Sequence, residues 1–356
     1  MKQSVRSDLR DSMITISHSP LAAATITRRR FLRQSFAFSA LAALGASPLT
    51  ASIPPSESSA LEFLMLGDWG YEDAAAQTSV AAAIGKYSQQ HSLKSEALLL
   101  LGDNWYGALE GGVHSLRWRT QFEEMYPAGA FPCPAYAILG NHDYQNWPES
   151  KVDAELEYAR LGKTRWTMPA RWYRFELPAK NPLVTFIALD SNMPYANGST
   201  SSGRNFTLTE AQRAEQLAWL ETELKRPRTT TFLVVMGHHP IYSDGSHGDH
   251  PTLIRDWDPL FRKYGVHLYL AGHDHDLQHL EFEGHPTSFF YSGGGGADLY
   301  DLKIDPTLRG PYAQKVYGFS HLSVTEKQMT LRHFDNNGRP LHAFTKTPEG
   351  KIAFRA

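Results

Sequence analysis

The sequence predicts an α/β fold in which helices flank a sandwich of two β-sheets. From residue 61, short apolar runs typical of buried strands alternate with stretches whose apolar residues recur at helical spacing. Towards the C-terminus, strands with alternating polar and apolar residues follow one another without helices between them. Alternating strands and helices followed by successive antiparallel strands indicate two packed sheets with helices outside them.

The individual elements follow from periodicity and from their boundary residues. The sequence Thr-Glu-Ala-Gln at Thr209 predicts a capped helix. In chain order we expect a strand over Leu61–Leu66, a helix over Ala74–His91, a strand ending at Leu101, helices over Ser115–Tyr126 and Asp153–Gly162, a hairpin of Arg171–Leu177 with Leu183–Asp190, a helix over Thr209–Lys225, a strand over Phe232–Met236, a helix over Asp258–Tyr264, and strands at Val266–Leu270, Leu280–Phe282, Ser288–Tyr291, Phe319–Val324, Met329–His333 and Leu341–Phe344.

Length and composition indicate a large core and no membrane-spanning segment after the N-terminus. The chain has 356 residues, of which 42% are hydrophobic, so a single domain over residues 52–356 can bury a sizeable core. No run reaches about 18 consecutive apolar residues, the length that would indicate a transmembrane helix. Cys133 is the only cysteine, which excludes an intramolecular disulfide and a metal site built from several thiolates.

The first 51 residues have the character of an export signal. Thr27-Arg28-Arg29-Arg30-Phe31-Leu32-Arg33 resembles the twin-arginine motif, and the moderately apolar stretch 36–44 follows it. We therefore expect residues 1–51 to be a twin-arginine signal peptide and linker, cleaved after Gly45 or Ala51. The twin-arginine export machinery would then deliver the protein to the periplasm or outside the cell. A disordered basic tail is the alternative.

The charge distribution argues against nucleic-acid binding. The formal net charge of the whole chain is −2. Residues 1–51 hold seven Lys or Arg against Asp8 and Asp11, which is a net +5, so the remaining chain carries −7. A non-specific nucleic-acid binder needs a basic surface, and the mature chain has no overall basic charge.

Five apolar runs are each followed at once by glycine and then by side chains that can hold a metal ion. These motifs are Gly67-Asp68-Trp69-Gly70, Gly102-Asp103-Asn104-Trp105-Tyr106, Gly140-Asn141-His142-Asp143, Gly237-His238-His239-Pro240 and Gly272-His273-Asp274-His275. Ligands in open α/β sheets bind at the carboxyl ends of the strands, so we expect the polar residues of all five motifs to meet there.

The ligand types indicate two metal ions. The candidates supply four oxygens and three nitrogens and no sulfur, a set that suits iron, manganese or zinc. They are Asp68, Asp103, Tyr106, Asn141, His238, His273 and His275. Seven ligands are too many for one ion with room for substrate, but they serve two ions if one carboxylate bridges. Two metals about 3.5–4 Å apart stabilise the attacking and leaving oxygens of phosphoryl transfer.

The five motifs, in this order, resemble the purple acid phosphatases of the metallophosphoesterase superfamily. The match spans residues 68 to 275, and the phrases Gly-His-Asp-His-Asp-Leu-Gln and Gly-His-His-Pro-Ile-Tyr-Ser are most similar to the small, mammalian-type tartrate-resistant branch. The resemblance implies a four-layer α/β/β/α sandwich of two mixed β-sheets flanked by helices. Residues 52–356 would form its single catalytic domain.

The resemblance also implies which residue holds which ion. It assigns a ferric ion to Asp68, Asp103, Tyr106 and His275, and a divalent iron, zinc or manganese ion to Asp103, Asn141, His238 and His273, with Asp103 bridging. Tyr106 discriminates the purple enzymes, because most metallophosphoesterases lack a tyrosine there and a phenolate on Fe(III) gives the colour.

By the same resemblance, the chain is an acid phosphatase that hydrolyses phosphate monoesters by direct attack of a metal-bound hydroxide. His247, helped by His142, would protonate the leaving alkoxide. Asn141 and His142 would contact the substrate, a small molecule or a phosphoprotein. At His239 the small enzymes usually have an aromatic residue, so His239 either contacts the substrate as part of the pocket lining or has a structural role. Asp143 and Asp274 would each orient an imidazole.

Two other function classes stay open on the sequence alone. A phosphodiesterase of the same superfamily, acting on nucleotide or lipid-headgroup diesters, would keep every metal ligand. A binding protein that has lost activity would be expected to lack a ligand or the proton donor, and none is missing here. Residues 192–205 are the place where we expect a regulatory loop, and we expect a monomer.

Overall fold

The computed structural model describes residues 60–147, 149–193, 207–303 and 309–355. The predicted signal peptide over residues 1–51 lies outside these ranges, as do residues 194–205 of the expected regulatory loop. Both therefore stay predictions. No helix in the described ranges is both long enough and apolar enough to cross a membrane.

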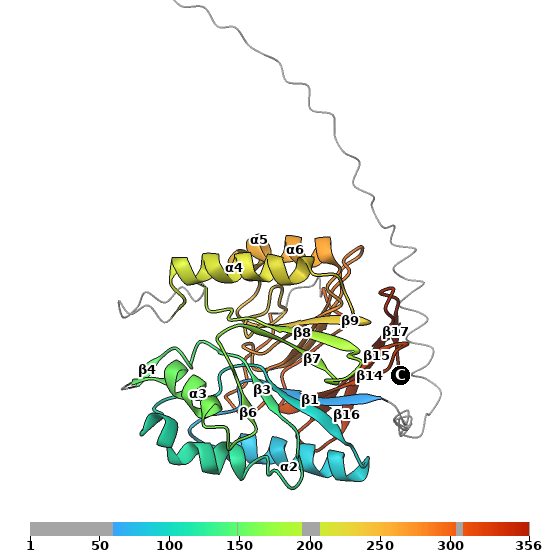
Figure 1. Cartoon of the computed structure of the whole chain (residues 1–356). Coiled ribbons are helices and arrows are strands. Elements are labelled where there is room, and N and C mark those ends of the chain that lie inside the picture. The colour runs from blue at the N-terminus through green and yellow to red at the C-terminus, as the bar shows by residue number, and fades with distance from the viewer. Residues whose placement is uncertain (1–59, 148, 194–206, 304–308, 356) are drawn as a thin grey trace, which may run out of the picture. The chain divides into compact units, whose positions relative to one another are not determined.

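Two mixed β-sheets form the centre of the domain (Figure 1). Within the described residues, the first sheet has the strand order β17-β16-β15-β14-β1-β2-β3-β6 and the second has the order β13-β11-β12-β10-β9-β8-β7. The first contains β1 (Leu61–Leu66), β2 (Ser95–Leu100), β3 (Ala135–Ala137), β6 (Trp166–Thr167), β14 (Gly318–Val324), β15 (Met329–Asp335), β16 (Pro340–Lys346) and β17 (Ile352–Phe354). The second contains β7 (Tyr173–Leu177), β8 (Val184–Ala188), β9 (Phe232–Met236), β10 (Leu268–Ala271), β11 (Leu277–Leu280), β12 (Ser288–Ser292) and β13 (Tyr312–Gln314). A separate two-stranded ribbon joins β4 (Asn146–Trp147) and β5 (Glu149–Ser150).

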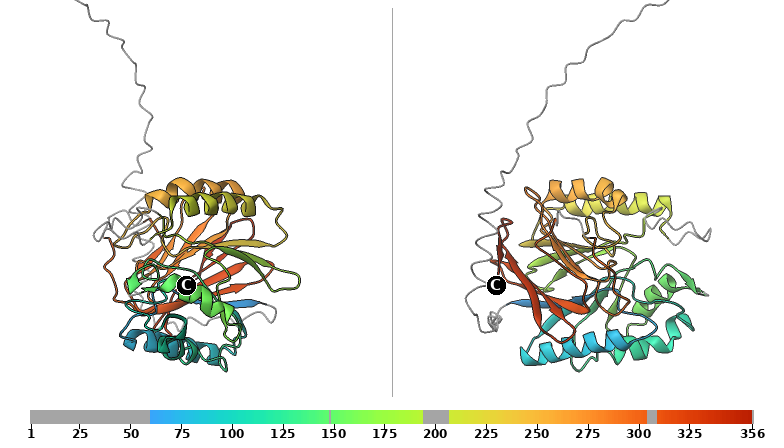
Figure 2. Two further views of the ribbon diagram at one scale, coloured as in Figure 1. Left: turned by 60° about the vertical axis from the view of Figure 1, so that its left-hand side comes forward. Right: turned by 180° about the vertical axis from the view of Figure 1, so that it is seen from behind.

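Helices lie outside both sheets, so the domain has four layers. Figure 1 shows α4, α5 and α6 on one side of the sheets and α2 on the other, and the views in Figure 2 show the same layering. The helical elements are α2 (Ala75–Gln90), η1 (Gly112–His114), η2 (Trp118–Glu123), α3 (Lys151–Arg160), α4 (Glu210–Lys225), α5 (Pro251–Asp256) and α6 (Asp258–Tyr264). The prediction of two mixed sheets flanked by helices is confirmed.

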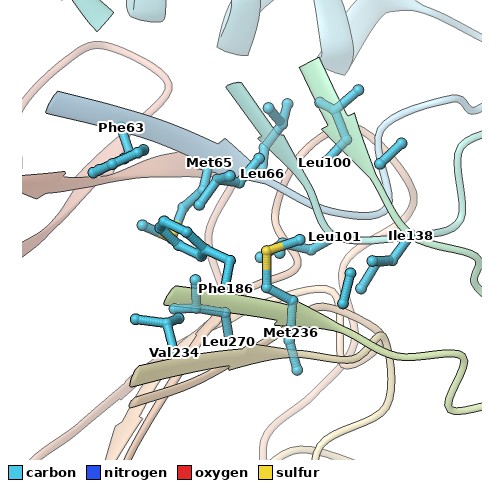
Figure 3. Close-up of a cluster of buried hydrophobic side chains, with 14 of the residues drawn as sticks. Phe63, Met65, Leu66, Leu100, Leu101, Ile138, Phe186, Val234, Met236 and Leu270 are labelled. Atoms are coloured by element: carbon cyan, nitrogen blue, oxygen red, sulfur yellow. The ribbon is translucent and has the colours of Figure 1, made fainter. Parts of the chain in front are cut away.

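The inner faces of the two sheets pack against each other to form the core. Figure 3 shows apolar side chains of the first sheet facing those of the second. The first group includes Phe63, Met65, Leu66, Leu100 and Leu101, and the second includes Phe186, Val234, Met236 and Leu270, all fully buried. Complete burial of such a side chain contributes about 1.5–3 kcal/mol, so these residues hold the two sheets in a fixed relation.

Most helix predictions are confirmed, and one is wrong in character. Thr209 caps α4 through the predicted box, since its side chain accepts from Gln212 N and the Gln212 side chain accepts from Thr209 N. The expected helix over Ser115–Tyr126 is instead centred on the short π-type segment η2, where Glu124 N donates to Arg119 O at 2.8 Å. The side chains of Trp118, Gln121 and Phe122 in this π-type segment are buried.

Other differences lie at the boundaries. The strand expected at Leu280–Phe282 is β11, which begins at Leu277 and ends at Leu280, the last residue that pairs with β12. Three elements, α5, β13 and β17, were not predicted, because each is too short for a periodic signal.

Buried histidines between the sheets couple stability to pH. His333 on β15 is fully buried and contacts Ser320 Oγ at 2.7 Å and Gln278 O at 3.1 Å. Burial, followed by the neighbouring His342, holds the pKa of His333 well below its ordinary value. As the pH falls, the His333 imidazole is therefore protonated at a higher pH in the unfolded chain than in the folded protein. The stability that His333 contributes is complete above the unfolded pKa of about 6.5 and is lost on acidification.

We predict that His333→Gln reduces the acid sensitivity of folding. When the pH falls from 7 to 5, a histidine that stays buried and neutral in the folded protein lowers the free energy of unfolding by about 2 kcal/mol. The variant should lack this decrease. Urea denaturation at both pH values measures the effect. His91→Gln, at an exposed position, is the matched control. Equal pH dependence in both variants would contradict the prediction.

Candidate metal centre

The candidate ligands follow the carboxyl ends of parallel strands from both sheets. In the first sheet, β1 pairs in parallel with β2 and β2 with β3, and these strands lead to Asp68, Asp103 and Asn141. In the second sheet, β9 and β10 pair in parallel and lead to His238 and to the segment 273–275. Backbone hydrogen bonds continue past the strands, from Asp68 N to Gly102 O and from Gly272 N to His238 O, both at 3.0 Å. The sequence motifs are therefore brought together at one edge of the sandwich.

Two motif glycines permit the close approach of ligands from different strands. Gly102 has a φ of +89°, and a Cβ there would lie 2.6 Å from His238 Nδ1. A Cβ at Gly140 would lie 2.2 Å from Asp103 Oδ1. Any larger residue at either place would push a candidate ligand out of the centre.

Four candidate ligands adopt a backbone conformation that non-glycine residues rarely take. Their φ angles are 59° at Asp68, 50° at Asp103, 73° at His273 and 45° at His275. Each such conformation costs about 1–3 kcal/mol and persists only where the surroundings enforce it, most often at functional sites. The orientation of these four side chains therefore lowers the stability of the fold.

A first group of ligands converges on one point. The Tyr106 hydroxyl lies 2.9 Å from His275 Nε2, 3.0 Å from Asp103 Oδ2 and 3.3 Å from Asp68 Oδ1. His275 Nε2 is 3.4 Å from Asp68 Oδ1. Ligands about 2.0–2.2 Å from an ion lie about 3 Å from their neighbours around it. The spacing and chemistry of these four donors fit one metal ion.

A second group shares Asp103 with the first. His238 Nε2 lies 3.4 Å from Asp103 Oδ2 and 3.1 Å from Asn141 Oδ1. The ring of His273 is centred 5.1 Å from the ring of His238. Asp103 thus stands between two sets of donors, as a bridging carboxylate would.

Hydrogen bonds aim the imidazoles and carboxylates. His238 Nδ1 donates to Leu101 O and His275 Nδ1 to Asp298 O, which leaves each Nε2 facing the centre. Metal-binding histidines commonly donate their other ring N–H to a carbonyl in this way. The second oxygens of the two carboxylates accept backbone N–H groups, Asp103 Oδ1 from His142 at 2.7 Å and Asp68 Oδ2 from His273 at 2.8 Å.

The buried carboxylates of the centre favour the binding of cations. Asp68 and Asp103 are almost completely buried. Burial alone would lower the pKa of His238, but Asp103 and then Asp68 outweigh it and raise that pKa to about 10. Burial, with Asp103 and Asp68, raises the pKa of Tyr106 well above its ordinary value. The surroundings of His238 and Tyr106 thus favour positive charge beside Asp103, which lies 3.4 Å from His238 Nε2 and 3.0 Å from the Tyr106 hydroxyl.

His247 lies beside the second group and is oriented by Asp274. Its ring centre is 4.1 Å from that of His273, and its Nδ1 donates to Asp274 Oδ1 at 2.6 Å. The other Asp274 oxygen accepts from Ser243 Oγ. The expectation that Asp274 orients an imidazole is confirmed. Because Nδ1 is engaged, Nε2 is the nitrogen of His247 that can exchange a proton.

Asp143 has a different role from the one expected. It accepts backbone N–H groups of Gly140, Asn104 and Trp105 at 2.8, 3.2 and 2.9 Å, and contacts no imidazole among the described residues. The expectation that it orients a histidine is therefore wrong. Asp143 instead ties the third motif to the second, since its carboxylate also accepts from the Asn104 side-chain Nδ2 at 3.2 Å.

His142 and His239 occupy unlike environments. His142 is half-buried, its ring centre lies 4.1 Å from that of Tyr106, and its Nδ1 is 3.0 Å from Gln145 Oε1. His239 is only 1% exposed, contacts Ser191 Oγ through Nδ1 at 2.8 Å, and packs 4.3 Å from the His273 ring. His142 can thus reach a substrate directly, whereas His239 lies behind the ligands.

One residue beside the centre was not anticipated. Tyr300 stacks on the His275 ring at 4.1 Å with an interplanar angle of 12°, and its ring centre is 5.2 Å from that of His247. Burial, then Asp68 and Asp103, raise the pKa of Tyr300 to about 12. No motif surrounds Tyr300 in the sequence, so only the folded chain reveals its position.

Comparisons with known proteins identify the relatives of this chain. A family model described as calcineurin-like phosphoesterase matches residues 61–277. Tartrate-resistant acid phosphatase type 5 of Oryctolagus cuniculus is 30% identical, covering 79% of this chain and 89% of that protein. Purple acid phosphatase 7 of Arabidopsis thaliana is 30% identical, covering 79% and 84%. The predicted family and the prediction of a phosphatase are confirmed.

Solved structures show the same fold at low identity. GAP50, described as the anchor in the inner membrane complex of Plasmodium, superposes with a TM-score of 0.63 and 20% identity, covering 83% of this chain and 90% of that one. Purple acid phosphatase PPD1 from yellow lupin superposes with a TM-score of 0.58 and 17% identity, covering 82% and 55%. These two likenesses bear on the fold alone. On the family model and the sequence relatives, the chain belongs to the calcineurin-like phosphoesterases and, within them, to the tartrate-resistant and purple acid phosphatases.

Proposed function

We propose that this acid phosphatase hydrolyses phosphate monoesters at a centre of two unlike metal ions. The observation that carries the proposal is the position of the Tyr106 hydroxyl, within 3.3 Å of donor atoms of Asp68, Asp103 and His275. A buried phenol among two carboxylates and an imidazole is a ligand set for a hard, highly charged ion.

The donor types support different ions at the two positions. The first group offers three oxygens and one nitrogen, which suits a ferric ion, and the second offers two oxygens and two nitrogens, which suits divalent iron, zinc or manganese. The first would be held by Asp68, Asp103, Tyr106 and His275, and the second by Asp103, Asn141, His238 and His273. When bound, two such ions would polarise the phosphate and lower the pKa of a coordinated water.

The chain itself would bind the ester and supply a proton. Asn141 and His142 are half-buried at the mouth of the centre and are the residues that we assign to substrate contact. His247 presents Nε2 because Asp274 holds Nδ1. In the proposed reaction, a hydroxide oxygen forms a bond to phosphorus while the bond between phosphorus and the ester oxygen breaks, and His247 gives its Nε2 proton to the departing ester oxygen, with His142 assisting. The products are inorganic phosphate and the alcohol.

Substrate class and export are further parts of the proposal. Small-molecule or phosphoprotein monoesters would be hydrolysed in the periplasm or outside the cell, by a monomer exported through the twin-arginine machinery. The arginines at 28–30 support this route. We assign His239 to packing behind His238 and His273 rather than to substrate contact, because its side chain is buried.

We predict that exported wild-type protein has a broad purple absorption band and that Tyr106→Phe lacks it. The band would arise from charge transfer between the Tyr106 phenolate and a ferric ion, so removal of one hydroxyl abolishes it. Visible spectroscopy with parallel iron analysis measures the effect, and Tyr264→Phe on α6 is the control. A colourless wild type that is fully metal-loaded and active would exclude the ferric assignment.

We predict that Asp103→Asn lowers the metal content below about two ions per chain, because the bridging position loses a negative charge that both ions share. Elemental analysis of the purified protein gives the stoichiometry. Asp153→Asn, in the first turn of α3, changes the net charge by the same amount and should keep both ions. Unchanged stoichiometry in Asp103→Asn would refute the bridging role.

We predict that His247→Ala lowers turnover of an alkyl phosphate by about 10²–10³-fold, since the poor leaving group then departs without a proton donor. Turnover of an aryl phosphate with a good leaving group should fall much less. Steady-state assays of both esters, together with a matched diester, measure this pattern. If both monoesters slow equally, His247 is not the donor, and preferential turnover of the diester would replace the monoesterase proposal.

A further inference from the structure

Tyr300 occupies the space between the candidate ferric site and the candidate proton donor. One face of its ring covers the imidazole of His275, and its ring stands at 72° to that of His247. The side chain is half-buried, so part of it is open to solvent. No other described tyrosine has ring contacts with both a candidate ligand and His247.

The backbone around Tyr300 is anchored on both sides. Before it, Asp298 O accepts from His275 Nδ1. After it, Leu302 bridges to Gly245, and Lys303 N donates to Asp244 O at 2.9 Å, in the loop that carries His247. The segment therefore connects the metal side of the site to the donor side, and it holds the Tyr300 ring in place.

The same segment adds a positive charge next to His247. A Cβ built at Gly248 would lie 2.2 Å from the ammonium nitrogen of Lys303. Asp244 and Asp249 of this loop are in turn engaged by Arg309, at 3.0 and 2.7 Å. Tyr300 and Lys303 thus bring a hydroxyl-bearing ring to His247 and a cation to the adjoining Gly248.

We propose that Tyr300 is a substrate-positioning residue whose hydroxyl donates a hydrogen bond to a phosphate oxygen of the bound monoester. Its ring forms the wall between His275 and His247. This inference deepens the proposed function and rests on it. Stacking on the face of His275 keeps the ring near that ligand without displacing its Nε2 from the centre. The leaving oxygen stays with His247, whose Nε2 the Tyr300 ring helps to orient.

The chemistry of the phosphate supports this role. Each terminal oxygen of a phosphate monoester can accept more than one hydrogen bond, so two metals and two histidines leave part of its acceptor capacity unused, and an unsatisfied acceptor in a partly desolvated site costs binding energy. The Tyr300 ring centre lies 4.1 Å from that of His275 and 5.2 Å from that of His247, so its hydroxyl is within reach of an ester bound between these two residues. A neutral donor there binds phosphate without adding repulsion to the two carboxylates.

The test is Tyr300→Phe in the metal-loaded full-length protein, with inorganic phosphate as the probe. A hydrogen bond to a charged group contributes about 1.5–3 kcal/mol, so the dissociation constant for phosphate should rise at least about tenfold. Calorimetry measures this constant directly. KM for an alkyl phosphate should rise in parallel, while kcat changes less than about threefold because the ring remains to orient His247.

Tyr300→Ala separates the ring from the hydroxyl. It should show the same loss of phosphate affinity, and kcat for the alkyl ester should now fall as well, because His247 loses its neighbour. Tyr264→Phe is the control for loss of a tyrosine hydroxyl at the surface. Metal content and the visible band should stay at wild-type values in all three variants.

Two results would overturn the inference. Unchanged phosphate affinity in Tyr300→Phe would show that the hydroxyl does not contact the anion. Loss of the visible band in the same variant would show that Tyr300 is a metal ligand. Failure of the proposed function looks different, because wild-type protein itself would then hydrolyse no monoester.

Discussion

The burial of two carboxylates, Asp68 and Asp103, at the junction of the sheets is the constraint on which the rest of the site depends. Transfer of an ionised carboxylate out of water is costly unless compensating charge and hydrogen bonds are provided. Here each carboxylate accepts one backbone N–H, and His238, whose pKa is raised by Asp103 and Asp68, lies 3.4 Å from Asp103 Oδ2. That compensation is partial. Bound cations would therefore offset the remaining free-energy cost of burying the two carboxylates, in addition to their role in catalysis.

The sandwich makes this burial possible because ligands come from strands in both sheets. Asp68 and Asp103 follow β1 and β2, whereas His238 and His275 follow β9 and β10. The core in Figure 3 fixes the spacing of the sheets, and hence the spacing of their ligands. Loss of core packing at β1 or β9 would therefore disturb the centre at a distance, without touching a ligand.

Sequence patterns predicted what depends on local chemistry and left out what depends on tertiary contact. The apolar runs located the strands that lead to the ligands, and the Gly-led motifs located the ligands, because both signals lie within a few neighbouring residues. Tyr300 gave no such signal, since its role comes from contact with His275 and His247 rather than from its neighbours in sequence. The same reason applies to η2, a π-type segment with three buried side chains, and to Asp143, whose carboxylate is used by backbone groups of another motif.

The tripeptide His273-Asp274-His275 shows how one short segment can set several distances at once. Its outer residues contribute one imidazole to each group of ligands, and both have positive φ angles of 73° and 45°. The carboxylate of Asp274, its middle residue, accepts a hydrogen bond from His247 Nδ1. The separation between the two ion positions and the proton donor is therefore fixed within three residues, which cannot drift independently. This arrangement requires two residues in the left-handed conformation, which lowers the stability of the fold. In return, it aligns the two ion positions with the proton donor, and such alignment accelerates the reaction.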